Sequence, residues 1–241
     1  MRTLVVGDIH GGLRGLEQAL DRLSPNGGDR FIYVGDYVDG WSDNAETVAF
    51  LIDFSKTYNC IFLRGNHDEL VYNYLKFDDD RPMWLAHGGE SSRKSYARFS
   101  REEIAVHIDF YEALENYHID NHNRLFLHAG FTDQKGPQYE FAPHNVYWDR
   151  TLWEMVCGLD DKLSESDEKY PKRLKLFSEI YIGHTPVTRI GHTKPVNVAN
   201  VWNVDTGAAF KGPLTIMDID TKEIWQSDPV WTLYPEEEGR N

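Results

Sequence analysis

The chain has 241 residues, of which 41% are hydrophobic and 27% charged, a composition typical of a globular protein with a sizeable core. Its 25 basic and 39 acidic residues give a net charge of −14, which argues against a nucleic-acid-binding surface. No apolar run approaches the roughly 20 residues of a membrane span, and two cysteines form no disulfide framework, so we expect a cytoplasmic monomer that binds neither nucleic acid nor membranes.

The first third of the chain alternates between strand and helix patterns. The predicted strands are residues 2–6, 30–34 and 60–64, and the predicted helices are 13–23, 44–57 and 68–77. In the first helix, Leu13, Leu16, Leu20 and Leu23 share one face. This alternation favours an α/β core with parallel strands.

The pattern changes after residue 77. A helical insertion is expected at about 77–115, with a capping box at Ser100–Glu103, and no Gly, Ser or Pro linker frames it. We therefore expect one domain over residues 1–241. A hairpin is predicted with its turn near 121–123, the charged segment 159–173 is predicted to be a solvated helix, and residues 236–241 are predicted to fray. Further strands are predicted at 179–183, 197–204, 213–220 and 222–228, which suggests two packed sheets.

A polar cluster follows each of five predicted strands. The clusters are GDIHG at 7–11, GDYVD at 35–39, RGNHD at 64–68, HAG at 128–130 and GHT at 183–185. Each cluster alone fits a turn or a helix cap, but the carboxyl ends of parallel strands meet at one crevice. Several carboxylates crowded there repel one another unless cations are present. Asp, His and Asn without paired Cys suit Mn, Fe(II) or Zn, and a carboxylate shared by two ions is typical of sites that clamp a phosphoryl group.

In this order, the motifs GDIHG, GDYVD, GNHD, HAG and GHTP resemble those of the calcineurin-like metallophosphoesterases, and most of all the compact bacterial and phage serine/threonine phosphoprotein phosphatases. The resemblance covers the chain from about Asp8 to Gly207, and NVDTGAAF at 203–210 is similar to the closing strand of the family. It implies an α/β fold, an αββα four-layer sandwich in which two mixed β-sheets pack together with helices outside. It also implies a two-metal hydrolase.

The resemblance further implies a ligand for each position of a binuclear centre. The ligands of one ion would be Asp8, His10 and Asp36, and those of the other Asp36, Asn66, His128 and His184. Asp36 would then bridge two divalent ions, for which we expect Mn²⁺, with Fe or Zn as alternatives. His192 repeats the GHT pattern but follows no predicted strand, so we do not expect it to be a ligand.

The resemblance also implies roles in the reaction for Asp39 and His67. Asp39 matches the family's Asp that pairs with the His of GNH, here His67, and such a pair fixes the imidazole tautomer. The resemblance implies that His67 protonates the leaving group while a metal-bridging hydroxide attacks phosphorus. An ordinary turn-forming Asp is the alternative for Asp39.

The sequence departs from the family directly after GDYVD. The family continues with an Arg that grips the phosphate, whereas this chain has Gly40 and Trp41. Arg64 matches another phosphate-contacting Arg of the family, and Arg150 in YWDR resembles a third. Trp41 is expected either to stack on an aryl or nucleoside group of the substrate or to lie in the core.

These observations predict a two-metal phosphomonoesterase, most simply a serine/threonine or tyrosine protein phosphatase whose substrate is a phosphorylated protein or a small phosphoester. The first alternative is a hydrolase of dinucleoside polyphosphates or other small phosphoanhydrides, whose family members share GDIHG and RGNHD. A non-catalytic metal-binding adaptor is the second alternative. It should have lost the bridging Asp or His67, and this chain retains both.

Overall fold

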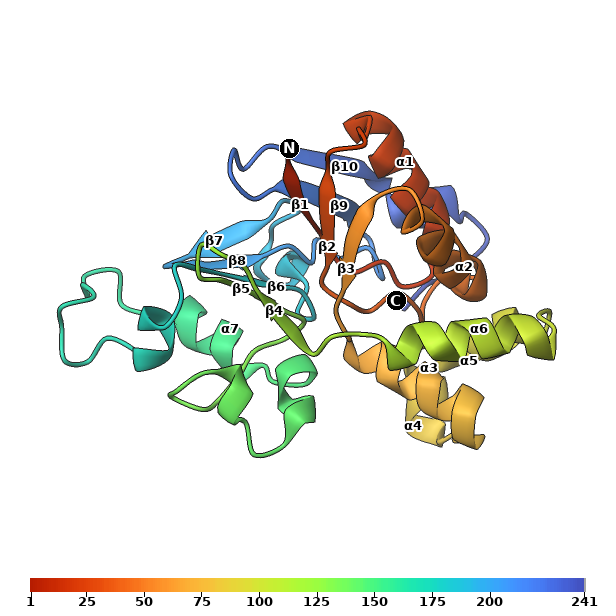
Figure 1. Cartoon of the computed structure of the whole chain (residues 1–241), viewed down its shortest axis with the longest axis horizontal. Coiled ribbons are helices and arrows are strands. Elements are labelled where there is room, and N and C mark those ends of the chain that lie inside the picture. Colours follow the sequence, from red (N-terminus) through yellow and green to blue (C-terminus); the bar gives the residue numbers. More distant parts are fainter. Residues whose placement is uncertain (241) are drawn as a thin grey trace.

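The computed structural model describes residues 1–240 and is built on two mixed five-stranded sheets that pack against each other (Figure 1). The first sheet has the order β10–β9–β1–β2–β3, with β1 Thr3–Val6, β2 Arg30–Tyr33, β3 Asn59–Phe62, β9 Pro213–Asp218 and β10 Ile224–Pro229. The second has the order β4–β5–β6–β8–β7, with β4 Tyr117–Ile119, β5 Arg124–Leu127, β6 Glu179–Ile182, β7 Val196–Val198 and β8 Val201–Asn203. The predicted α/β fold with two packed mixed sheets is confirmed.

The parallel strands of each sheet set the position of the polar clusters. In the first sheet β1, β2 and β3 are parallel, and in the second β5, β6 and β8 are parallel. Between the sheets lies an apolar layer that includes Val5, Ile32 and Met217 from the first sheet and the stacked rings of Phe126 and Tyr181 from the second. Burial of these side chains joins the sheets and fixes how the loops after the strands face one another.

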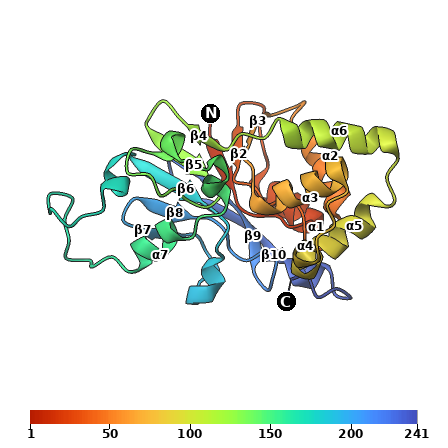
Figure 2. The ribbon, with the colours of Figure 1, turned by 90° about the horizontal axis from the view of Figure 1, so that it is seen from below.

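Helices cover the outer faces of both sheets (Figures 1 and 2). The helices that follow the first three strands are α1 Leu13–Leu23, α2 Asn44–Phe54 and α3 Asn66–Phe77. In α1, Leu16, Leu20 and Leu23 are buried, as the apolar spacing predicts. The second sheet is covered by α7 Thr151–Cys157 and by short 3₁₀ segments, of which those between residues 130 and 180 are η2 Pro137–Tyr139, η3 Pro143–Tyr147 and η4 Lys172–Lys175.

The segment after α3 is helical, as predicted for 77–115. It contains α4 Pro82–Trp84, the π-helical turn η1 Leu85–Gly89, α5 Glu90–Tyr96 and α6 Arg101–Glu112. The predicted capping box opens α6, where Ser100 accepts from the amide of Glu103 and Glu103 accepts from the amide of Ser100. Two short 3₁₀ turns, η5 Val187–Ile190 and η6 Val230–Leu233, complete the list of helical elements.

Three expectations were wrong. Residues 159–171 form turns rather than a helix, because their many charged residues supply no apolar stripe to hold a helix against the protein. The predicted strand 197–204 is divided at Ala199, whose positive φ of 52° turns β7 back to pair with β8. Residues 236–240 are packed on the protein rather than frayed, since Glu237 accepts hydrogen bonds from Ser42. Within the described chain, no helix is long and apolar enough to cross a membrane.

Candidate active site

The loops after β1, β2, β3, β5 and β6 meet at one place. The structure brings together all six predicted metal ligands there, and all are buried: Asp8, His10, Asp36, Asn66, His128 and His184. Backbone hydrogen bonds tie these loops to one another, because the carbonyl of Asp36 accepts from the amides of Ile9 and His10. The amide of His184 donates to the Asp8 carboxylate across the two sheets.

Four of the site residues have a positive φ, a backbone conformation that residues other than glycine rarely adopt. The φ angles of His10, Asp36, Asp39 and His184 are 54°, 55°, 67° and 68°. A residue keeps such a strained conformation only where surrounding contacts hold it, and strained residues are common at functional sites. Here Asp68 supplies some of these contacts, since its carboxylate accepts from the amides of Asp36, Tyr37 and Gly65 at 2.7–2.9 Å.

The first group of candidate ligands is Asp8, His10 and Asp36. The Nε2 atom of His10 lies 3.8 Å from Asp8 Oδ2 and 3.5 Å from Asp36 Oδ2. The Nδ1 atom of the same ring is 2.9 Å from the carbonyl oxygens of Val38 and Asp39, to which it donates. That bond leaves Nε2 with its lone pair toward the carboxylates, as a metal ligand requires.

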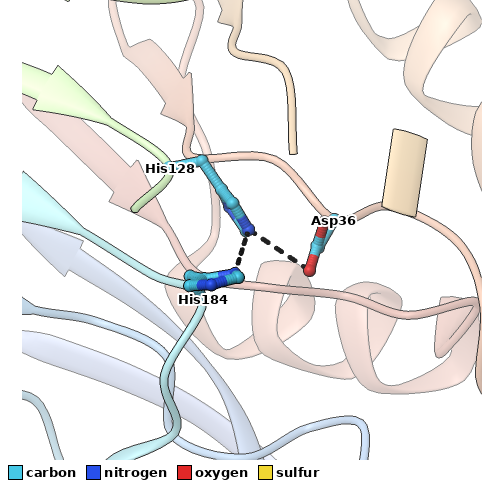
Figure 3. A group of neighbouring side chains, drawn as sticks. All are labelled: Asp36, His128 and His184. Atoms are coloured by element: carbon cyan, nitrogen blue, oxygen red, sulfur yellow. Dashed lines mark hydrogen bonds and ion pairs between the residues drawn. The ribbon is translucent and has the colours of Figure 1, made fainter. Parts of the chain in front are cut away.

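The second group is Asp36, His128 and His184, whose side chains point toward one another (Figure 3). His128 Nε2 is 3.3 Å from Asp36 Oδ2, 3.1 Å from His184 Nδ1 and 3.2 Å from Asn66 Oδ1. One ring nitrogen carries at most one proton, so it cannot satisfy three acceptors at once. Its other nitrogen, Nδ1, is 2.9 Å from the carbonyl of Val34. The arrangement is that of ligands converging on a cation.

The buried carboxylates of this cluster also favour a bound cation. Burial raises the pKa of Asp8 to about 7, and the neighbouring charge of Asp36 adds to the rise. Burial, together with the charge of Asp8, raises the pKa of nearby Asp205 to about 8. Burial also opposes ionisation of Asp36, but the positive charges of His128, His67 and His10 and a hydrogen bond from His128 together hold the pKa of Asp36 well below its usual range. The donor set therefore fits two divalent ions, with Asp36 common to both groups.

Asp39 and His67 form the pair that the resemblance implied. Asp39 Oδ2 lies 2.7 Å from His67 Nδ1 and 2.7 Å from the indole Nε1 of Trp84, and Asp39 Oδ1 accepts from Ser92 Oγ at 2.6 Å. Trp84 and Ser92 belong to the helical segment after α3, and no local sequence pattern indicates that either contacts Asp39. This helical segment thus holds the carboxylate that orients His67.

A cavity opens over the metal-ligand cluster, and three arginines line it. They are Arg150, Arg189 and Arg240, and His67 lines the same cavity. Arg150 was predicted as a phosphate ligand, and its Nη1 donates to Thr185 Oγ1 at 2.9 Å. Arg189 and Arg240 were not predicted.

The other predicted phosphate ligand, Arg64, lies outside the cavity lining. Its Nη2 donates to the carbonyl of Tyr111 at 2.7 Å, and its guanidinium lies over the ring of Tyr72. A contact between Arg64 and a bound phosphate would therefore require its side chain to turn, and this role stays a prediction.

Trp41 lies in the core, which decides between its two predicted environments. Its side chain is fully buried, its Nε1 donates to the carbonyl of Ala208 at 2.7 Å, and its ring stacks on Tyr234. Gly40 is needed for a close approach, because an added Cβ would lie 2.7 Å from the His10 carbonyl oxygen. His192 is exposed and lies in the turn beyond η5, away from the cluster.

Two packed mixed sheets that bring two overlapping groups of candidate metal ligands together at their strand ends are the arrangement expected of a metal-dependent phosphoesterase. The chain belongs to the calcineurin-like phosphoesterase family, whose family model matches residues 1–210. It is a metal-dependent hydrolase of phosphoric esters.

Three similar proteins carry two different activities in their names. The chain is 26% identical to a bis(5'-nucleosyl)-tetraphosphatase (asymmetrical), PrpE, of Oceanobacillus iheyensis, over 93% of this chain and 91% of that protein. It is also 26% identical to serine/threonine-protein phosphatase 1 of Salmonella typhimurium, over 89% of this chain and 90% of that protein. A protein serine/threonine phosphatase from Saccharomyces cerevisiae has the same fold, with a TM-score of 0.61 and 15% identity over 95% of this chain and 80% of that one.

Proposed function

We propose that the chain is a phosphomonoesterase that releases phosphate from phosphorylated serine or threonine residues of proteins. The observation that carries this proposal is the Asp39–His67 pair beside the metal-ligand cluster. A serine or threonine alkoxide is a poor leaving group and needs a proton as the bond to phosphorus breaks. The leaving group of a phosphoanhydride is a much weaker base, so a dedicated acid helps it less.

Each residue of the site has a role in this proposal. Two divalent ions, for which we propose Mn²⁺, would supply Lewis acidity and neutralise charge on the phosphoryl group when held by the six ligands. His67 donates the proton from Nε2 to the leaving oxygen, because its Nδ1 is bonded to Asp39. Asp39 fixes the ring orientation and stabilises its protonated form. Arg150 would bind the phosphate oxygens.

Hydrolysis of dinucleoside polyphosphates is the second candidate. The similarity to the Oceanobacillus tetraphosphatase favours it, and so does the presence of three guanidiniums around one cavity, since a polyphosphate chain carries more charge than a single phosphoester. The non-catalytic adaptor is not supported, because the bridging Asp36 and His67 are both in place and the family is one of hydrolases.

A substrate panel separates the two candidates. The protein, loaded with Mn²⁺, is assayed on a phosphoserine peptide, 4-nitrophenyl phosphate and diadenosine tetraphosphate, with a chelated sample as control. We expect kcat/KM for the phosphopeptide to exceed that for diadenosine tetraphosphate by roughly tenfold or more, which corresponds to about 1.4 kcal/mol in transition-state binding. The reverse order would replace the first candidate by the second.

A further inference from the structure

Residues 235–240, called here the 235–240 segment, lie against the loop that follows β2. Ser42 donates from its amide and its hydroxyl to the two carboxylate oxygens of Glu237, at 2.9 and 2.7 Å. Gly239 has a φ of 61°, and an added Cβ there would lie 2.6 Å from the ring of Trp41. The 235–240 segment thus packs on the buried ring of Trp41 at Gly239, where any side chain would collide with the ring.

The same packing fixes the position of Arg240. Its amide donates to the carbonyl of Ala209 at 3.0 Å, and its guanidinium lies over the ring of Phe210, 5.5 Å from the centroid. Both Arg240 and Phe210 line the cavity above the metal-ligand cluster. A cation held over an aromatic face in this way keeps its hydrogen-bond donors free for an anion.

The three arginines that line the cavity gather positive charge around it. Across residues 1–240, neither Arg150, Arg189 nor Arg240 forms an ion pair with a carboxylate. Burial lowers the pKa of Arg150, and the neighbouring charges of Arg189 and Arg240 lower it further, whereas the charges of Asp36 and Glu154 raise it. Like charges gathered around one cavity favour an anion between them.

We infer that Arg240 binds the substrate phosphate. The 235–240 segment places the guanidinium of Arg240 at the cavity, whereas Gly40 has no side chain that could bind phosphate. A side chain at position 40 would meet the carbonyl of His10, and Gly40 is not part of the lining of this cavity, whereas Arg240 lines it from a distant part of the chain. The inference rests on phosphoester hydrolysis but not on which of the two candidate substrates is used, since both present phosphate oxygens to the metal centre.

The test measures phosphate binding directly. Inorganic phosphate is used as a competitive inhibitor of 4-nitrophenyl phosphate hydrolysis, and its Ki is compared across the full-length wild type, Arg240→Ala and Arg240→Lys. Charge-assisted bonds from a guanidinium justify an expected rise in Ki and fall in kcat/KM of roughly ten- to a hundredfold for Arg240→Ala. Arg240→Lys should recover part of the loss, since it restores the charge but not the bidentate geometry.

Matched variants show whether the effect comes from the segment. Glu237→Ala removes the anchor to Ser42 and should raise the phosphate Ki, whereas Glu236→Ala, an exposed neighbour on the same segment, should not. Arg101→Ala removes an equal charge from the exposed start of α6 and should also leave Ki unchanged.

Two results would overturn the inference. One is a Ki and kcat/KM of Arg240→Ala within about twofold of the wild type, a difference of under ~0.5 kcal/mol. The other is a loss that accompanies an equal loss of bound metal or of the folded state, because Arg240 would then be structural. If diadenosine tetraphosphate proves the better substrate, the phosphomonoesterase proposal fails while the Ki for phosphate still decides the role of Arg240.

Discussion

Replacing His67 by asparagine should separate proton donation from metal binding. The His67 imidazole is buried, and its Nδ1 is held 2.7 Å from an Asp39 carboxylate that two further side chains fix in place. A positioned general acid contributes about 10²–10⁴ in rate, or about 2.7–5.4 kcal/mol of activation free energy. Because the orientation is fixed on several sides, we expect a loss of kcat in the upper part of this range, ~10³–10⁴, for phenyl phosphate.

The decisive readout is how the loss depends on the leaving group. A series of aryl phosphates with increasingly acidic phenols is assayed with the wild type and His67→Asn, and metal content is measured for both. The loss should shrink toward the 4-nitrophenyl ester, whose leaving group needs little protonation, while the metal content stays unchanged because His67 is not among the six ligands. His87→Asn is the matched control, since His87 is exposed and its Nδ1 faces the carbonyl of Met83. An equal loss across the whole series would remove His67 from the acid role.

Three further outcomes are expected. Asp36→Asn should lose both metal ions together, because Asp36 belongs to both ligand groups, and retention of one ion by elemental analysis would contradict a bridging role. His184→Ala should reduce bound metal severely, whereas the exposed His192→Ala should not, and the reverse result would contradict the placement of GHT at 183–185. Burial lowers the pKa of His107, in α6, to about 4, so the unfolded chain binds the extra proton and the free energy of unfolding should fall as the pH drops from about 6.5 toward 4. In urea titrations His107→Gln should show a smaller fall over this window than the wild type, and an identical fall would show that His107 does not contribute.

The convergence of the candidate metal ligands could be predicted because these residues follow strands directly. A strand is recognisable from four or five apolar residues, and parallel strands bring their ends to one edge whatever lies between them. Asp8, Asp36 and His128 were therefore predictable together although more than 90 residues separate the last two. The positive φ angles of His10, Asp36 and His184 were not predictable, because residues other than glycine rarely adopt them unless the tertiary structure enforces them.

The parts of the site that come from other segments could not be predicted. Trp84 and Ser92 lie in helices whose apolar pattern shows only that they are helical, and nothing local indicates that they contact Asp39. Three glutamates shortly before Arg240 predict a solvent-exposed segment. The packing of Gly239 on Trp41, which brings Arg240 to the cavity, has no signal in the local sequence. In both cases the contact depends on how separate layers dock, which one sequence does not encode in any local pattern.

Residues of the loop after β2 contribute to metal binding, to the orientation of the acid and to the position of Arg240. Asp36 belongs to both metal-ligand groups, Asp39 orients the acid, Trp41 supports the 235–240 segment and Ser42 anchors it through Glu237. A shift of this loop would therefore move metal ligands, acid and Arg240 together. A Cβ added at Gly40 would lie 2.7 Å from the carbonyl oxygen of His10, so we expect that an arginine introduced there cannot restore the missing phosphate contact without displacing His10. It would push His10 away from the carboxylates first, and loss of metal should precede any gain in phosphate affinity.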